Sequence, residues 1–278
     1  MGGYGAVTSN ASPNGQTRRA SSEQHPLLAK PPRPAWIDRV RKHMTQNVDK
    51  RWADLILLLC YTVTGLLDSS AVFIWGSFVS MQTGNTVYLG LGLIEPTAGT
   101  RWIRSLTSIS FFCLGSLCFS RFSRFFSPRR RWVLVVSFTA QLVLVAAAAV
   151  VVMVDPEKGG DLRWEVIVPI ALVAFQSSGQ AITSRALQYN SLTSVVLTSI
   201  YCDLFADPNL FVMQNAERNR RTAAPLLLLV GAILGGLWAH SSVGLAGALW
   251  TAAILKFLMV LTWLAWRSEP EAQDSPHD

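Results

Sequence analysis

Residues 77–94 read Ser-Phe-Val-Ser-Met-Gln-Thr-Gly-Asn-Thr-Val-Tyr-Leu-Gly-Leu-Gly-Leu-Ile, and the arrangement of the whole chain depends on this stretch. A second stretch of the same kind covers residues 190–206, Asn-Ser-Leu-Thr-Ser-Val-Val-Leu-Thr-Ser-Ile-Tyr-Cys-Asp-Leu-Phe-Ala. A helix that crosses a bilayer needs about 20 predominantly apolar residues. Both stretches are shorter and more polar than that, so neither is a typical membrane span.

Six long apolar segments surround these two stretches. They cover residues 52–75, 103–122, 132–154, 164–187, 222–240 and 243–266. Tryptophans mark their ends, as expected for a side chain that prefers the headgroup level: Trp52, Trp75, Trp102, Trp132, Trp164, Trp238 and Trp266. Only 15% of the residues are charged, against about 25% in a typical soluble domain. The sequence therefore predicts an all-α polytopic integral membrane protein.

The basic residues predict how the segments are oriented. Arginine and lysine gather before residue 52, in the 121–131 loop, at 218–221 and at Arg267. Positive loops stay in the cytosol, which places both termini there. A full crossing by 77–94 would export the arginines of the 121–131 loop, and a full crossing by 190–206 would export those at 218–221. We therefore expect six transmembrane helices and two short re-entrant or broken helices.

The two halves of the membrane region correspond to each other. Each half contains a long span, a short polar helix and two further spans, and the halves begin on opposite sides, so the sequence predicts a 3+3 inverted repeat. The predicted organisation is a disordered cytosolic tail (1–34), a basic juxtamembrane segment (35–51), repeat 1 (52–154), a non-cytosolic loop (155–163), repeat 2 (164–266) and a cytosolic tail (267–278).

The juxtamembrane segment 35–51 has two interpretations. Trp36, Val40 and Met44 recur at about one helical turn, and basic residues such as Arg39 and Arg41 lie among them. This pattern fits a helix on the anionic surface of the membrane. It also fits a solvated basic linker.

Polar residues at membrane depth define the candidate site. Short polar segments in corresponding positions of two halves point to a transporter site. The predicted solute-binding residues are Asp68, Gln82, Thr83, Gly84, Asn85, Thr86, Gln176, Ser178, Gln180, Thr193 and Ser194. A helix that begins in the first stretch, with a threonine or asparagine cap, would present free N–H groups to a polar ligand. The alternative is that these side chains only satisfy backbone groups and pack against neighbours.

Three polar residues within the spans carry separate expectations. Asp68 is the candidate carrier of a proton or coupling cation, because a carboxylate within a span is costly. Lys256 is expected to extend toward the cytosol and not to pair with Asp68, since their depths differ by roughly 10–15 Å. Gln141 is expected to be structural. We expect no metal, cofactor or nucleic acid, because no ligand spacing or nucleotide-binding motif occurs.

The sequence resembles a known family in one region. Gly65-Leu66-Leu67-Asp68, followed by Ser80-Met81-Gln82-Thr83-Gly84-Asn85-Thr86-Val87, is similar to the Gly-x-x-Asp and Met-Thr-Gly-Asn-Thr-Val pattern of the family catalogued as domain of unknown function 1275. Gln82 is an insertion relative to that pattern. The resemblance covers about 52–266 and implies a protein with about six spans, without an established activity. The long polar tail fits a fungal member.

These features predict a secondary transporter or facilitator that moves a small polar solute, with a proton or cation, across a lipid bilayer. The alternative is a non-transporting scaffold, receptor or lipid-binding protein. An enzyme is not expected, because no nucleophile–base or metal arrangement is present. Glu23, Leu27 and Leu28 resemble an acidic dileucine sorting motif, so the expected location is the vacuolar or plasma membrane.

Overall fold

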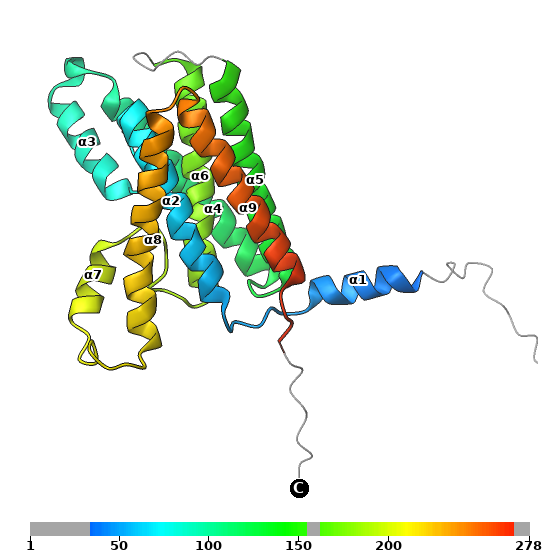
Figure 1. Cartoon of the computed structure of the whole chain (residues 1–278). Coiled ribbons are helices and arrows are strands. Elements are labelled where there is room, and N and C mark those ends of the chain that lie inside the picture. The colour runs from blue at the N-terminus through cyan, green and yellow to red at the C-terminus, as the bar shows by residue number, and fades with distance from the viewer. Residues whose placement is uncertain (1–33, 155–161, 270–278) are drawn as a thin grey trace, which may run out of the picture.

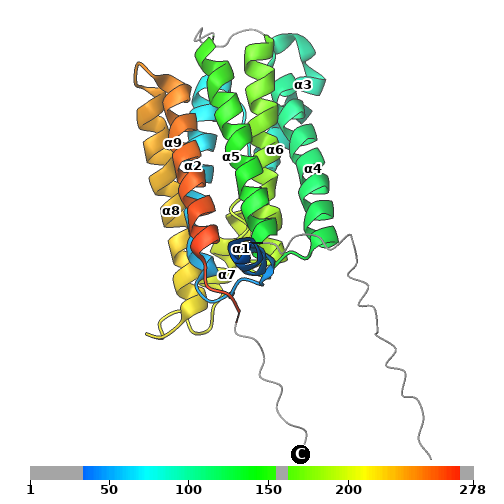
Figure 2. The same cartoon turned by 90° about the vertical axis from the view of Figure 1, so that its right-hand side faces the viewer.

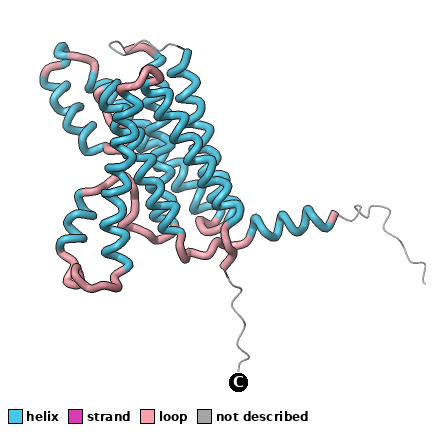
Figure 3. Tube along the Cα trace, viewed as in Figure 1, coloured by secondary structure: helices cyan, strands magenta, loops and turns pink. Residues whose placement is uncertain are grey.

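The structure is a computed structural model that describes residues 34–154 and 162–269, and every regular element in this part of the chain is a helix (Figure 3). Six of these helices are long and apolar enough to cross a membrane: α2 (Ala53–Trp75), α4 (Arg101–Phe126), α5 (Arg131–Val154), α6 (Trp164–Ala186), α8 (Ala216–Ala239) and α9 (Gly244–Ala265). The shorter ones are α1 (Ala35–Thr45), α3 (Gln82–Ile94), the 3-10 turn η1 (Pro96–Ala98) and α7 (Thr198–Phe205). The prediction of an all-α protein with six spans is confirmed. The sorting motif Glu23, Leu27 and Leu28 and most of the 155–163 loop lie outside the described residues.

The outer faces of the spans are apolar. Leu226, Leu229, Ile233 and Leu237 of α8 each have more than half of their surface exposed. A continuous apolar surface of this kind is rare on a soluble monomer. Hydrocarbon is its natural surrounding, because lipid tails solvate such side chains without cost.

Each short polar stretch enters the bundle from one end and returns to that same end, and the two stretches enter from opposite ends (Figure 1). After α2 the chain turns back at Gly76, which adopts a positive φ of 72°, and descends as far as Val79 and Ser80 before α3 leads outward again. These two residues bind Asp68, which lies about 10 Å below the end of α2 at 1.5 Å per residue. The chain between α6 and α7 makes the equivalent excursion from the opposite end. We call residues 76–94 and 187–206 the first and second re-entrant segments.

The helix contacts repeat between the halves in the pattern of an inverted repeat. Helix α2 packs on α8, and its counterpart α6 packs on α4, which is the counterpart of α8. The α2–α9 and α6–α5 contacts correspond in the same way, and α5 packs on α9. A Cβ added at Gly231 of α8 would lie 2.0 Å from the Thr62 carbonyl oxygen of α2. A Cβ added at Gly115 of α4 would likewise lie 2.5 Å from the Phe175 carbonyl oxygen of α6.

Both described termini lie at one end of the bundle, together with the arginine-rich loops, and we call this the basic end (Figures 1 and 2). Residues 35–45 form the helix α1, which lies across the direction of the spans beneath α5 (Figure 2). Residues 46–49 then run between the α4–α5 loop and the C-terminal residues, where Val48 N–H donates to the Arg129 carbonyl at 2.9 Å and Asp49 N–H donates to the Arg267 carbonyl at 3.0 Å. The first part of segment 35–51 is therefore a helix, and its position on the anionic membrane surface stays a prediction.

Candidate functional site

Asp68 holds the tip of the first re-entrant segment. One carboxylate oxygen accepts hydrogen bonds from the backbone N–H groups of Val79, at 2.8 Å, and Ser80, at 2.9 Å. The other oxygen accepts from the Ser80 hydroxyl. All three residues are buried, and backbone groups at membrane depth have no water to bond. The contact thus accounts for a carboxylate in α2 without a coupling ion, and the coupling role of Asp68 stays a prediction.

Asn85 satisfies the same loop from the other side. Its amide oxygen accepts from the Phe78 N–H at 3.0 Å, and its amide nitrogen donates to the Phe78 carbonyl at 2.8 Å. The Asn85 side-chain amide thus satisfies both the N–H and the carbonyl of Phe78, as a paired backbone peptide group would. Asn85 also donates to the Gln82 side-chain oxygen at 2.9 Å and to the Ser108 hydroxyl of α4 at 3.0 Å. These bonds fasten α3 to α4.

The other residues of this motif do not face a shared site. Thr83 and Thr86 are exposed on the outer surface of α3, and the Thr86 hydroxyl donates back to the Gln82 carbonyl at 2.8 Å. Gly84 permits a close approach, because a Cβ there would lie 2.6 Å from the ring of Phe78. The prediction of a threonine or asparagine cap is wrong: α3 begins at Gln82, and no side chain caps it. The Asn85 amide is occupied by the descending loop instead.

The second re-entrant segment is held differently. Tyr61 of α2 donates a hydrogen bond to the Ser191 carbonyl at 3.4 Å. Thr193 and Ser194 follow, both buried, and Ser194 adopts a positive φ of 60°. Ser178, which the repeat aligns with Asp68, bonds within its own helix α6 and does not reach this loop. The two halves therefore share an arrangement of helices but not the side chains that hold their loops.

Four polar side chains join in the interior of the bundle. Lys256 Nζ donates to the Gln180 side-chain oxygen at 2.8 Å and to the Gln141 side-chain oxygen. The Gln180 amide nitrogen donates to the Thr64 hydroxyl at 3.2 Å. Each of the four has at most 1% of its surface exposed. They come from α9, α6, α5 and α2, two helices from each half, and we call them the central polar chain.

The surroundings of the central polar chain contain few charges. Lys256 Nζ lies 5.1 Å from the centre of the Phe138 ring. Gln176 lies one turn before Gln180 on α6; its amide nitrogen donates to the Ser177 hydroxyl at 3.1 Å, and its buried side-chain oxygen has no partner. No carboxylate among residues 34–154 and 162–269 forms an ion pair with Lys256.

The expectation that Lys256 extends toward the cytosol is wrong, and its contact with Gln141 was not predicted. The side-chain nitrogen stays inside because two amide oxygens accept its hydrogen bonds there. Gln141 is the only amide side chain of α5 and Lys256 the only charged side chain of α9, both near the middle of a mostly apolar span, and α5 and α9 correspond between the halves. This correspondence is the signal that could have identified them. Lys256 and Asp68 have different partners, as the depth argument predicts.

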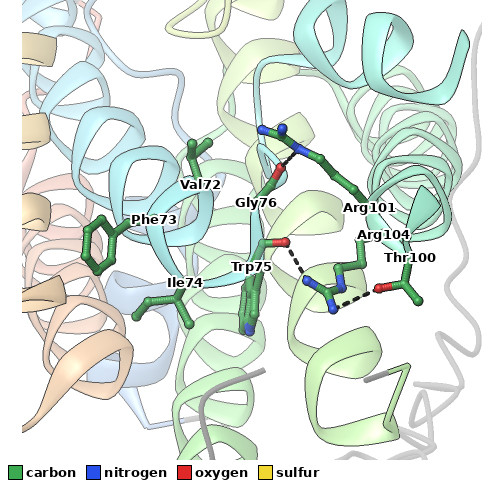
Figure 4. A pocket seen from close by; sticks show the side chains of 9 residues that line it. Val72, Phe73, Ile74, Trp75, Gly76, Thr100, Arg101 and Arg104 are labelled. Atoms are coloured by element: carbon green, nitrogen blue, oxygen red, sulfur yellow. Dashed lines mark hydrogen bonds between the residues drawn. The ribbon is translucent and has the colours of Figure 1, made fainter. Parts of the chain in front are cut away.

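An open cavity of about 600 Å³ lies away from the basic end, between the end of α2 and the start of α4 (Figure 4). Arg101 donates to the Gly76 carbonyl and lies 3.4 Å from the centre of the Tyr88 ring. Arg104 donates to the Trp75 carbonyl at 2.8 Å. These arginines tie the C-terminal end of α2 to α4. The lining residues include none of the predicted site residues: Val72, Phe73, Ile74, Trp75, Gly76, Gly99, Thr100, Arg101 and Arg104.

The comparison with known proteins identifies a family. Residues 56–262 match the family described as "Protein of unknown function (DUF1275)". No curated protein and no solved structure matches the chain. The matched region runs from α2 into α9 and includes Asp68, Asn85 and the central polar chain. Because the match covers most of the sequence, the chain belongs to the DUF1275 family.

Proposed function

We propose that this protein is a secondary transporter or facilitator of a small polar solute, and that the solute binds at the central polar chain. One observation carries the proposal. A fully buried lysine is bonded to glutamines from both halves of the bundle. Ionisable groups at membrane depth are expensive, and they usually mark a path for solutes or ions.

The arrangement of the helices supports the same function. Transporters with inverted repeats place their sites near the membrane midplane, where the repeats meet and helices are interrupted. Thr64 and Gln180 link the first span of each half, and the two re-entrant segments approach the interior from opposite ends. Relative movement of the halves would expose the central polar chain first to one side and then to the other.

We further propose that the basic end faces the cytosol, so that both termini are cytosolic. Arg129 in the α4–α5 loop, Arg131 at the start of α5 and Arg218 in the first turn of α8 lie at this end, as the positive-inside rule requires. Helix α1 presents Trp36 and Val40 to the outside and carries Arg39 and Arg41, so it suits the anionic surface of a cytosolic leaflet. A vacuolar or plasma membrane location stays a prediction.

A second candidate function is a non-transporting scaffold, receptor or lipid-binding protein. The exposed, basic helix α1 favours it, because none of its residues is buried. Deletion of residues 1–34 separates the two functions, since a transporter that reaches the membrane keeps its flux without the tail. We propose no enzymatic activity for either function.

The buried thiol of Cys60 offers a direct test of transport. Cys60 is buried in α2, one helical turn before Thr64 of the central polar chain, whereas Cys113, Cys118 and Cys202 are exposed. In a variant with these three replaced by serine, a water-soluble methanethiosulfonate should modify Cys60 in liposomes, because a transporter must open its centre to water. Transported solutes should slow this modification.

A protein that does not transport should give the opposite result in this labelling experiment. Cys60 would stay unmodified in the folded protein but react fully after denaturation in SDS. Together with no uptake of any small anion, sugar, polyol or amino acid by liposomes that contain the full chain, this result would refute transport and favour the scaffold.

A further inference from the structure

The bonds of Lys256 suit an uncharged amine as well as an ammonium group. The two acceptors, on Gln141 and Gln180, are neutral amide oxygens, and a neutral amine has two N–H donors for them. A permanent charge without a counterion is strongly unfavourable in such a place. The geometry therefore accommodates the lysine as a neutral amine. Its nitrogen lone pair can accept one more proton when a negatively charged ligand binds.

We propose that the central polar chain binds a small monovalent anion together with one proton, and that Lys256 carries this proton. The inference rests on the proposed transport function and names its substrate class. When the anion binds, the amine takes up one proton from water and becomes an ammonium ion, which pairs with the anion. When the anion leaves, the proton returns to water. One negative and one positive charge cross together, so no net charge moves.

The neighbouring groups suit such a ligand. The Gln141 amide nitrogen donates to the Ser137 hydroxyl at 3.3 Å and that of Gln180 to the Thr64 hydroxyl. Both acceptors are neutral, and an anion binds amide N–H donors more strongly than a hydroxyl does. A single lysine matches a single negative charge. The ring of Phe138 beside it offers an apolar contact for the body of a monocarboxylate.

Few other groups compete for the proton. Helices α5 and α6 present only neutral side chains to Lys256. Helix α2 carries the buried Cys60 thiol one turn before Thr64, and its Asp68 carboxylate is bonded to the first re-entrant segment. The ionisable residues of α8 lie in its first two turns, at the basic end: Glu217, Arg218, Arg220 and Arg221.

The test uses the full chain in liposomes that contain a pH-sensitive dye. Lactate and acetate represent monocarboxylates, nitrate and chloride represent inorganic anions, and lactamide and glycerol are neutral controls. An inward gradient of the transported anion should acidify the lumen, and a potassium–valinomycin potential should not change the rate. Protein-free liposomes correct for passive diffusion of the protonated acids.

Variants of Lys256 locate the proton. Lys256→Gln should reduce the acidification to less than about a tenth, since no group remains to pair with the anion. Lys256→Arg stays charged at every accessible pH, so it should bind the anion and slow modification of Cys60 without acidifying the lumen. Thr262→Val, on the exposed face of the same helix, is the matched control and should behave as the wild type.

The outcomes distinguish the two proposals. Uptake of lactamide or glycerol but of no anion would overturn the anion assignment and leave transport standing. Anion uptake that moves charge and leaves the lumen pH unchanged would overturn the proton on Lys256. No uptake together with an unreactive Cys60 would refute transport itself. If Lys256→Gln does not fold, as judged by gel filtration, the Lys256→Arg and wild-type measurements decide.

Discussion

Replacement of Asp68 should separate a structural carboxylate from a coupling one. In Asp68→Ala the buried N–H groups of Val79 and Ser80 lose their acceptor. Each unsatisfied buried donor costs about 1–3 kcal/mol. The variant also removes a buried carboxylate, which returns part of this loss. We expect the free energy of unfolding to fall by about 2–5 kcal/mol.

Asp68→Asn keeps an oxygen in the same place. The amide oxygen can accept from both N–H groups, and the Ser80 hydroxyl can reverse its role and accept from the new amide nitrogen. We therefore expect a loss of about 1 kcal/mol or less, because neutral hydrogen bonds replace charge-assisted ones. If the carboxylate is structural, this variant also keeps its solute flux and the pH dependence of that flux.

The assay is unfolding in mixed micelles by titration with SDS, followed by circular dichroism. A double-mutant cycle of Asp68→Ala with Ser80→Ala should give a coupling energy of about 1–2 kcal/mol, since the Ser80 hydroxyl donates to the Asp68 carboxylate. The structural role is refuted if Asp68→Ala is as stable as the wild type, or if Asp68→Asn is as unstable as Asp68→Ala. A stable Asp68→Asn that has lost flux would instead restore the coupling role.

Three further predictions concern other parts of the chain. Gly231→Ala should lower the free energy of unfolding in detergent by about 1–3 kcal/mol, because its Cβ would lie 2.0 Å from a carbonyl oxygen of α2. Gly236→Ala has open space around it and should leave this free energy unchanged. In nanodiscs with anionic lipid, the backbone of α1 should be more protected from hydrogen exchange than in nanodiscs with neutral lipid. The double variant Arg39→Gln/Arg41→Gln should lose this extra protection, because each arginine contributes about 1 kcal/mol to binding at the anionic surface. The pKa of Asp207 in the folded protein is lowered from 3.8, chiefly by the hydrogen bond from the Asn209 N–H. The bonds of its carboxylate should therefore order the 207–215 loop at any pH above 3.8, and they should be lost as the pH falls through the lowered pKa. Proteolysis of the loop should therefore rise at acidic pH in the wild type and be independent of pH in Asp207→Asn.

The architecture was accessible from the sequence because a bilayer restricts it strongly. Every backbone group must be bonded within the protein, so a long apolar run becomes a helix. If the arginines at 121–131 and 218–221 stay in the cytosol, the number of membrane crossings that precede each cluster must be even. Segments 77–94 and 190–206 must therefore return to the side from which they enter, and the contacts of Val79 with Asp68 and of Ser191 with Tyr61 are those of re-entrant segments.

The candidate site was less accessible, because composition does not tell which partner a polar side chain takes. Asp68 and Asn85 stood out as polar residues at depth, and both direct their hydrogen bonds to a loop of the same half. Thr83 and Thr86 are close to Asn85 in sequence but lie on the outer surface of α3, since neighbouring residues of a helix point in different directions. Of the predicted residues, only Gln180 belongs to the central polar chain.

Lys256 was misassigned because the reach of its side chain was considered without its neighbours. A lysine in hydrocarbon lowers its energy by extending to the interface, but a lysine beside two amide oxygens can stay. Gln141 and Gln180 provide them from α5 and α6, which are distant in sequence from Lys256 and meet it only when both halves are assembled. A polar centre shared by the halves in this way holds the two halves together. It must also come apart if they move, so a solute that takes over the bonds of Lys256 would lower the barrier to that movement.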